Sequence, residues 1–379
     1  MLNQFTVDRF FKVGVSVVLV GLLAACASGS KAPKPAELGV NPALMGVRSV
    51  WKAQIGKVDF PLAVYTSANT VTLASSDGNV SSLDAQTGAS LWRIKLDTQI
   101  SAGVGSDGAY ASVVTRDNQL VTMVAEGELW RVRLSSQVFT APLVAGERVF
   151  VLGADRVVSA FDARSGKKLW SNQRPGEALV LRQAGALLAV NNTLIVGLSG
   201  RLVGLNPLTG NVVWDAPLAT PRGTNDIERL VDLVAGVSRD GNVVCARAFQ
   251  AAVGCLNTNQ GNVIWKQVAS GVAGLSGDDK QVYGVEADGK LMAWRLSDGV
   301  VTWTSDRLRY RQPGTPLVLG RSVVVGDSTG LLHFVARTDG TPLTRLSTDG
   351  SAIVATPVLA GTTLVAVTRN GTVFGFQPE

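Results

Sequence analysis

The sequence predicts an all-β fold, an eight-bladed β-propeller built from four-stranded antiparallel blades. Three observations predict it: a repeated phrase that leads to a tryptophan, the regular spacing of that phrase, and incomplete units at the two ends of the chain. Repeats of about forty residues that are rich in β-branched residues and glycine are typical of propeller blades rather than of helical solenoids.

The repeated phrase is clearest at residues 83–92, which read Leu-Asp-Ala-Gln-Thr-Gly-Ala-Ser-Leu-Trp. With the tryptophan near the front of the chain, the markers of this kind are Trp51, Trp92, Trp130, Trp170, Trp214, Trp265 and Trp303. A last copy has Thr344 where the indole is expected. Successive markers lie 38 to 51 residues apart, so about eight units fill the chain after residue 46.

Each unit also predicts its own strands. In the first, residues 71–75 and 80–83 alternate as strands around Asp77-Gly78, a hairpin turn in which glycine adopts the required positive φ. The aspartate of the repeated phrase makes a second turn by accepting bonds from nearby backbone N–H groups, and the tryptophan begins the outer strand. A single sheet cannot bury both of its faces, so we expect the indoles to pack between neighbouring blades as structural residues.

The chain ends predict how the ring closes. Trp51 lies on a strand with no hairpin before it, whereas residues 363–376 form a hairpin with no tryptophan phrase after it. The two fragments together complete one blade, which gives eight and removes exposed sheet edges. Seven blades remain the alternative if the degenerate unit near Trp130 forms no blade of its own.

The first residues predict export and lipid attachment rather than fold. Arg9 and Lys12 precede an apolar run at 13–23 that is short for a membrane span. The run ends in Leu-Ala-Ala-Cys, which resembles the lipobox of bacterial lipoproteins. Residues 1–25 are therefore expected to be a signal peptide, Cys26 the lipid (palmitate) attachment site, and residues 26–45 a flexible tether before the propeller at 46–379. An ordinary secretory signal with a chance cysteine is the alternative.

Little in the sequence indicates chemistry. The net charge of +6 is modest and scattered, so no basic face for nucleic acid is expected. No spacing typical of metal ligands, nucleophile elbows or phosphate loops occurs, and we expect no catalytic, cofactor-binding or metal residues. The sole histidine, His333, lies in an alternating stretch and is expected to be packed. The basic run 307–311 is interpreted as a solvated strand edge, or otherwise as part of a docking face.

Two cysteines remain in the repeats. Cys245 and Cys255 lie on the arms of a hairpin centred near Gln250. Opposite residues of an antiparallel pair are within bridging range, and an oxidising compartment favours the bond. We expect a disulfide, with two buried free thiols as the alternative.

Two stretches depart from the repeat, residues 175–185 and residues 221–232. Function in a rigid scaffold is usually carried by such loops. A solvated insertion beside an ordinary strand is the alternative.

The repeated Asp-x-x-Thr-Gly-x-x-x-Trp phrase resembles the pyrroloquinoline-quinone (PQQ) type of propeller repeat. Quinoprotein dehydrogenases with this repeat are longer and carry adjacent paired cysteines, which this chain lacks. The lipobox, tether, eight units, ring closure and the stretches 226–232 and 326–334 instead resemble the BamB family, lipoprotein subunits of the outer-membrane β-barrel assembly (BAM) machinery.

This resemblance implies a non-catalytic scaffold, lipid-anchored at the periplasmic face of the outer membrane, that docks on the POTRA domains of BamA and assists nascent outer-membrane proteins. By motif, the partner-binding residues are Leu179, Leu181, Arg182 and Asp232. Val234 stands where members often have a second acidic residue. Functions of other classes remain open: a periplasmic PQQ-dependent dehydrogenase, or a lipoprotein that binds glycan or peptide at the channel mouth.

Overall fold

The computed structural model describes residues 33–174, 179–221, 224–225 and 230–379. The chain divides into two compact units, residues 1–35 and 36–379. Of the first unit, residues 33–35 are described and have no regular secondary structure, so the predicted signal peptide and Cys26 lie outside the described residues. In the described parts of the chain, no helix has the length and apolar character needed to span a membrane.

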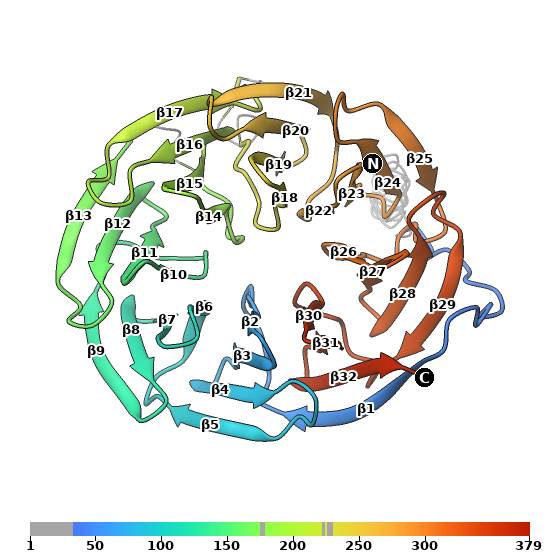
Figure 1. Cartoon of the computed structure of the whole chain (residues 1–379), viewed down its shortest axis with the longest axis horizontal. Coiled ribbons are helices and arrows are strands. Elements are labelled where there is room, and N and C mark those ends of the chain that lie inside the picture. Colours follow the sequence, from blue (N-terminus) through green and yellow to red (C-terminus); the bar gives the residue numbers. More distant parts are fainter. Residues whose placement is uncertain (1–32, 175–178, 222–223, 226–229) are drawn as a thin grey trace, which may run out of the picture. The chain divides into compact units, whose positions relative to one another are not determined.

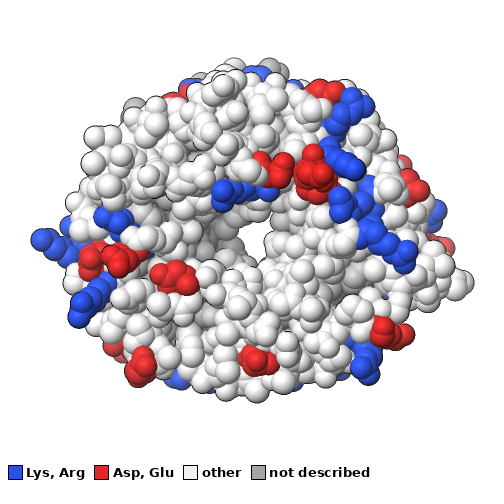
Figure 2. Space-filling model, viewed as in Figure 1, with Lys and Arg blue, Asp and Glu red and all other residues white. Residues whose placement is uncertain are grey.

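Residues 36–379 form a closed ring of eight four-stranded antiparallel sheets around a central opening (Figure 1). The predicted all-β propeller is confirmed, and so is the blade number, because the unit that contains Trp130 forms a complete blade of its own. Around the opening, the face seen in Figure 2 is mostly uncharged, with acidic and basic side chains in one cluster at the upper right and another at the left.

Blades 1 to 4 follow the chain in order. Their strands are β2 (Tyr65–Ser67), β3 (Thr70–Ala74), β4 (Asn79–Asp84) and β5 (Ser90–Lys95); β6 (Ile100–Ser106), β7 (Ala111–Thr115), β8 (Gln119–Val124) and β9 (Gly127–Arg133); β10 (Leu143–Ala145), β11 (Arg148–Leu152), β12 (Val157–Asp162) and β13 (Lys168–Gln173); and β14 (Leu187–Val190), β15 (Thr193–Leu198), β16 (Arg201–Leu205) and β17 (Val212–Pro217).

Blades 5 to 8 complete the ring. Their strands are β18 (Ser238–Asp240), β19 (Val243–Ala248), β20 (Ala252–Asn257) and β21 (Asn262–Val268); β22 (Leu275–Gly277), β23 (Gln281–Val285), β24 (Leu291–Arg295) and β25 (Val301–Ser305); β26 (Leu317–Leu319), β27 (Ser322–Gly326), β28 (Leu331–Ala336) and β29 (Pro342–Ser347); and β30 (Val358–Ala360), β31 (Thr363–Val367), β32 (Thr372–Pro378) and β1 (Val47–Gln54).

The eighth blade joins the two ends of the propeller. Strand β1 pairs with β32 in a register that runs from Val47 opposite Pro378 to Gln54 opposite Thr372. The closure predicted from the incomplete end units is therefore confirmed. No sheet in the described chain is left with an unfilled place for a fourth strand.

The order of strands gives the ring two different faces. Because the strands of a blade alternate in direction, the turns between its second and third strands lie on the same face as the connections that lead into the next blade. We call this the loop face. Backbone bonds join these neighbouring segments, as from Leu96 N to Gly78 O (2.9 Å) and from Leu134 N to Asn118 O (2.8 Å).

The core lies in the joints between neighbouring blades, each filled by its own cluster of buried apolar residues. At the joint of blades 5 and 6, Trp265 Nε1 donates to Leu296 O at 2.7 Å. Gly299, at φ +74°, lies so close that a Cβ there would be 2.4 Å from Trp265 Cε3. The same donation joins Trp51 to Ala85, Trp130 to Ala163, Trp170 to Pro207, and Trp303 to Arg337.

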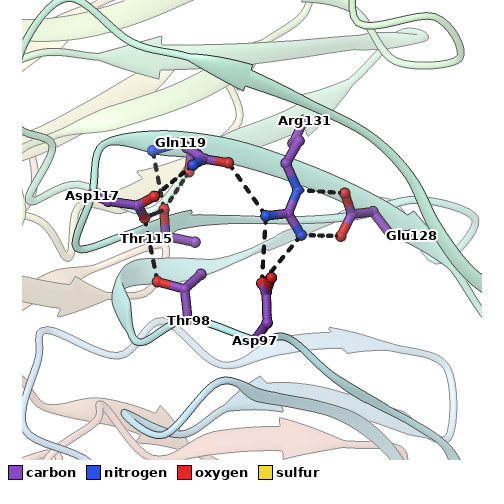
Figure 3. Close-up of polar contacts among 7 residues, drawn as sticks. All are labelled: Asp97, Thr98, Thr115, Asp117, Gln119, Glu128 and Arg131. Atoms are coloured by element: carbon purple, nitrogen blue, oxygen red, sulfur yellow. Dashed lines mark hydrogen bonds and ion pairs between the residues drawn. The ribbon is translucent and has the colours of Figure 1, made fainter.

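Among the seven marker tryptophans, two lack this bond to another described residue. Trp214 Nε1 is buried without a hydrogen-bond acceptor. Trp92 faces blade 2, whose turn before Gly127 has lost the repeated phrase, and a Cβ on Gly127 would meet nothing within 4 Å. A polar network holds that joint instead (Figure 3): Arg131 Nη1 and Nη2 lie 3.4 Å from Asp97 Oδ1, and Thr98 Oγ1 donates to Asp117 at 3.3 Å.

Arg131 is the centre of this network. Its Nε and Nη2 donate to the two oxygens of Glu128, both at 2.6 Å, and these bonds raise the pKa of the guanidinium. Asp97 lies in the connection that enters blade 2, whereas Glu128 and Arg131 lie on β9. The charges therefore tie the outer strand of blade 2 to the segment arriving from blade 1.

Residues 36–45 run against blades 6 and 7. Ala36 N donates to Arg309 O at 2.9 Å, and Leu44 N donates to Leu343 O at 2.7 Å. The basic run 307–311 is a turn, not the strand edge that we expected, because Arg309 N bonds back to Asp306 O at 3.1 Å. Its last member, Arg311, points inward and pairs with Asp327.

Candidate functional site

Three segments from different blades meet on the loop face. They are the turn at 153–156 in blade 3, the connection between blades 3 and 4, described from residue 179, and the end of the connection between blades 4 and 5, described from residue 230. The four residues expected to bind a partner lie on the second and third of these segments. We refer to residues 179–185 as the 179–185 loop.

Arg156 and Asp232 form the centre of this meeting point. Arg156 closes its turn by donating its N–H to Gly153 O at 3.0 Å, with φ +61°. Its Nη1 lies 3.0 Å from Asp232 Oδ1, and the two side chains are only 7% and 18% exposed. Such a sheltered charge-assisted bond is stronger than one between neutral groups.

The same two side chains hold the start of the 179–185 loop. Arg156 Nη2 donates to Leu179 O at 2.8 Å, and Leu181 N donates to Asp232 Oδ2 at 3.0 Å. Each oxygen of Asp232 thus accepts a bond from inside the chain. The loop is fixed farther along by the bond from Gly185 N to Thr140 Oγ1 at 2.9 Å.

The loop presents its side chains differently. Leu179 is 42% exposed, and Arg182 is exposed as well, whereas Leu181 is half-buried. The guanidinium of Arg182 lies over the ring of Phe139, 5.7 Å from its centroid, which favours a fixed orientation. The site therefore offers one apolar side chain and one positive charge to the solvent.

Val234 lies in the interior of the protein. It occupies the position at which the family resemblance implies a second acidic residue. It is 1% exposed, and its N–H donates to Arg247 O at 3.1 Å. An apolar side chain suits this buried position, so the site has a single carboxylate, that of Asp232, on this segment.

Two hollows adjoin the loop. A small one of about 50 Å³ lies between Leu181, Asp232 and blade 3. A larger cleft of about 580 Å³ lies beside Arg182 and is lined also by Arg116, Phe60, Phe139 and Asp59. No hydrogen bond or ion pair to a carboxylate is formed by Arg116 or Arg182 within the described chain, so the cleft keeps two positive charges available.

The central opening differs in character. Its cavity of about 740 Å³ is lined mostly by glycine, alanine, proline and other uncharged residues of the inner strands and of the segments that lead into them, and Asp107 is the single charged residue among its described lining. Within the described ranges, no group of three or more His, Cys, Asp or Glu residues is placed to hold a metal ion.

The remaining residues singled out by the sequence lie away from the loop. Cys245 and Cys255 are opposite each other on β19 and β20, with their sulfurs bonded and their Cα atoms 3.9 Å apart. His333 is 5% exposed on β28, and its Nε2 lies 2.9 Å from Asp327 Oδ2. The seven marker tryptophans lie on the outermost strands of blades 1 to 6 and 8.

Asp327, the carboxylate that bonds His333, accepts several further hydrogen bonds. Burial opposes its charge, but bonds from His333, Leu331 N and Thr329 outweigh that effect and hold the pKa of Asp327 well below its usual range. Arg311 Nε adds a further bond at 2.9 Å. Every one of these partners lies in blade 7 or in the connection that enters it, which makes the cluster a structural support of that blade.

Sequence reasoning missed Arg156 and Phe139. Arg156 is 76 positions from Asp232 and 23 from Leu179. Nothing local marks a contact over such a distance. Only the ring geometry, which brings three consecutive loop-face segments together, identifies it.

Comparison with known proteins gives a consistent picture. A family profile described as "Outer membrane protein assembly factor BamB" matches residues 76–305. The chain is 36% identical over 363 residues to the protein of that description from Burkholderia pseudomallei (strain K96243), covering 94% of this chain and 95% of the relative.

Solved structures share the fold. The crystal structure of BamB from Moraxella catarrhalis covers 87% of this chain and 99% of its own, with a TM-score of 0.80 and 23% identity. The quinohemoprotein alcohol dehydrogenase from Comamonas testosteroni covers 91% of this chain and 79% of its own, with a TM-score of 0.67 and 14% identity. At these identities both structures bear on the fold alone.

Proposed function

The chain belongs to the BamB family of outer membrane protein assembly factors, and from this membership we propose that it is a non-catalytic scaffold of the outer-membrane β-barrel assembly machinery. In this role it docks on the POTRA domains of BamA and assists the folding and insertion of nascent β-barrel proteins. Cys26 carries the lipid that anchors the chain at the periplasmic face of the outer membrane, after removal of residues 1–25.

The observation that supports docking most strongly is the held conformation of the 179–185 loop. A loop that is already ordered loses less conformational freedom on binding, so more of its contact energy remains as affinity. Leu179 offers an exposed apolar anchor and Arg182 an exposed charge at the rim, a combination typical of protein interfaces.

Charge supports a partner surface that carries carboxylates. Arg116 and Arg182 line the same cleft beside the loop. Guanidinium groups pair well with carboxylates, and a complementary partner also associates faster. We therefore expect the part of the POTRA domains that meets this cleft to be acidic.

The proposal is tested by binding of full-length protein to the purified POTRA region of the cognate BamA. Leu179→Ala, Leu181→Ala and Arg182→Ala should each weaken binding, by about tenfold or more for a residue at the centre of an interface. Leu208→Ala is the matched control, because Leu208 is 62% exposed in a turn on the opposite face of the ring. Normal binding by all three loop variants would refute the assigned surface.

Anchoring is tested separately. Labelled palmitate should be incorporated into the chain in cells and should be lost in Cys26→Ser. Labelling that survives this substitution would refute the assigned attachment site without bearing on the docking surface.

The dehydrogenase alternative has a direct test of its own. Purified protein incubated with pyrroloquinoline quinone and calcium should bind no quinone and should reduce no dye with alcohols or sugars. Turnover under these conditions would replace the scaffold proposal.

A further inference from the structure

Asp232 has both of its carboxylate oxygens committed inside the chain. Oδ1 accepts from Arg156 Nη1 at 3.0 Å, and Oδ2 accepts from Leu181 N at 3.0 Å. A carboxylate that is 18% exposed and bonded at both oxygens is poorly placed to bond a partner as well. Its internal partners, by contrast, belong to a turn of blade 3 and to the loop that carries the exposed side chains.

We infer that Asp232 and Arg156 act together as a brace that positions the 179–185 loop, and that the partner contacts Leu179, Leu181 and Arg182 rather than the Asp232 carboxylate. This inference rests on the docking proposed above. It makes Arg156, which no pattern in the sequence indicates, as important for binding as Asp232. Both are positioning residues.

The geometry explains why one ion pair has this effect. Arg156 holds the loop through the carbonyl of Leu179, and Asp232 holds it through the N–H of Leu181, so the two side chains fix the backbone on both sides of residue 180. Their own ion pair keeps the two holding groups together. Loss of either member removes one direct bond to the loop and also removes the ion pair between the two side chains.

Ordering the backbone of a residue costs conformational entropy, so a loop released from the brace loses more entropy when the partner binds. The side chains that meet the partner are unchanged in the released loop. Arg182 keeps its own support on Phe139, which is independent of the ion pair. The expected defect is a lower population of the binding-competent loop, not a lost contact.

A double-mutant cycle separates positioning from contact. Full-length Asp232→Ala, Arg156→Ala and the double variant are compared for affinity to the POTRA region of the cognate BamA. Each single variant should bind about tenfold more weakly, and the double variant should bind no more weakly than the worse single one. Additive losses would overturn the inference, because a carboxylate that contacts the partner still costs affinity when lost from an Arg156→Ala background.

Two conservative variants sharpen the result. Arg156→Lys keeps a charge for Asp232 but cannot also reach Leu179 O with a second fixed nitrogen, so its affinity should lie between those of the wild type and Arg156→Ala. Asp232→Asn retains one acceptor oxygen but loses the charge, so its affinity should likewise lie between those of the wild type and Asp232→Ala. Arg148→Ala is the control, since Arg148 lies at the other end of the same hairpin, bonded to Gly146 O.

Amide hydrogen exchange on the free protein tests the brace without a partner. Exchange in residues 179–186 should rise in Asp232→Ala and Arg156→Ala, whereas exchange in the strands of blades 6 to 8 should stay unchanged. A rise throughout the ring, or no rise in the loop, would overturn the brace.

The outcomes distinguish this inference from the proposed function. If Leu179→Ala and Leu181→Ala weaken binding but the Arg156 and Asp232 effects add, the docking surface stands and only the brace fails. If the leucine variants bind normally, the docking surface is wrong, and the inference that the loop is positioned for the partner fails with it.

Discussion

At the scale of single residues, the propeller depends on short polar side chains that bond backbone groups. It also depends on buried charged side chains that are hydrogen-bonded or ion-paired. Asp327 is the clearest case, with a side chain fully shielded from solvent and bonds from His333, Arg311 and Thr329. Removing one member of such a buried charged set costs far more than removing an exposed ion pair.

Asp327→Asn should lower the free energy of unfolding by about 3 kcal/mol at neutral pH, because an amide cannot accept bonds from all of these donors. Since the pKa of Asp327 is lowered in the folded state, its contribution is complete above the unfolded aspartate value of about 3.9 and is lost as the pH falls below it. The gap between wild type and variant should therefore narrow as the pH falls from about 5 to 3.

Urea unfolding across this pH range measures the gap. Asp279→Asn is the control, because Asp279 is exposed on blade 6. A gap that stays the same down to pH 3, or that widens there, would contradict the assigned role of the charge.

The sequence predicted the repeated structural residues but not the arginines that form single ion pairs. The tryptophans and turn residues recur at a fixed spacing, and the repetition revealed them. Arg156 and Arg311 occur once each, and their carboxylate partners are 76 and 16 positions away. Neither contact leaves a pattern in the sequence around the arginine. The basic run at 307–311 was wrongly expected to form a strand edge, because its alternating residues instead form a turn in which Arg309 N bonds back to Asp306 O.

At the scale of elements, the joints between blades are chemically unequal. The joint of blades 5 and 6 has a buried indole with a bonded Nε1, whereas the joint of blades 1 and 2 relies on the Arg131 network (Figure 3). The missing indole bond coincides with a turn that has lost its Thr-Gly pair, so the sequence indicated the weaker unit but not the charges that compensate for it.

Trp265→Ala should destabilise the protein by about 3–5 kcal/mol, because it leaves a cavity and an unpaired carbonyl at Leu296. Trp92→Ala should cost about half as much, since Trp92 is only half-buried and gives up no Nε1 bond. Thermal and urea unfolding of the two variants gives the comparison. Equal losses would mean that the indole bond and burial do not set the strength of a joint.

At the scale of the whole molecule, closure depends on one pairing, that of β1 with β32. The sequence predicted this pairing because each end lacks what the other supplies. The same pairing accounts for Thr344, whose strand β29 is the outermost of blade 7. The next blade has no turn of the repeated kind, because its outer two strands come from opposite ends of the chain.

Deletion of residues 372–379 should abolish cooperative unfolding and cause aggregation, because β1 and β31 both lose their partner and present open edges. The matched control is a permuted chain that starts at residue 55 and continues from residue 379 through a short linker into residues 46–54. This order should fold normally, since Glu379 N already bonds Gly46 O at 3.1 Å. Circular dichroism and size-exclusion chromatography distinguish the two, and a well-folded deletion variant would show that the ring does not need its eighth blade.

The pairing of β1 with β32 also determines when, during synthesis, the ring can close. The side chains of Gln54 and Thr372 that bond across it are 318 positions apart. At a synthesis rate of about 5–20 residues per second, the first strand leaves the ribosome roughly 16 to 64 seconds before its partner exists. Any factor that handles the growing polypeptide therefore meets an open row of blades, and the ring can close only after β32 has been synthesised.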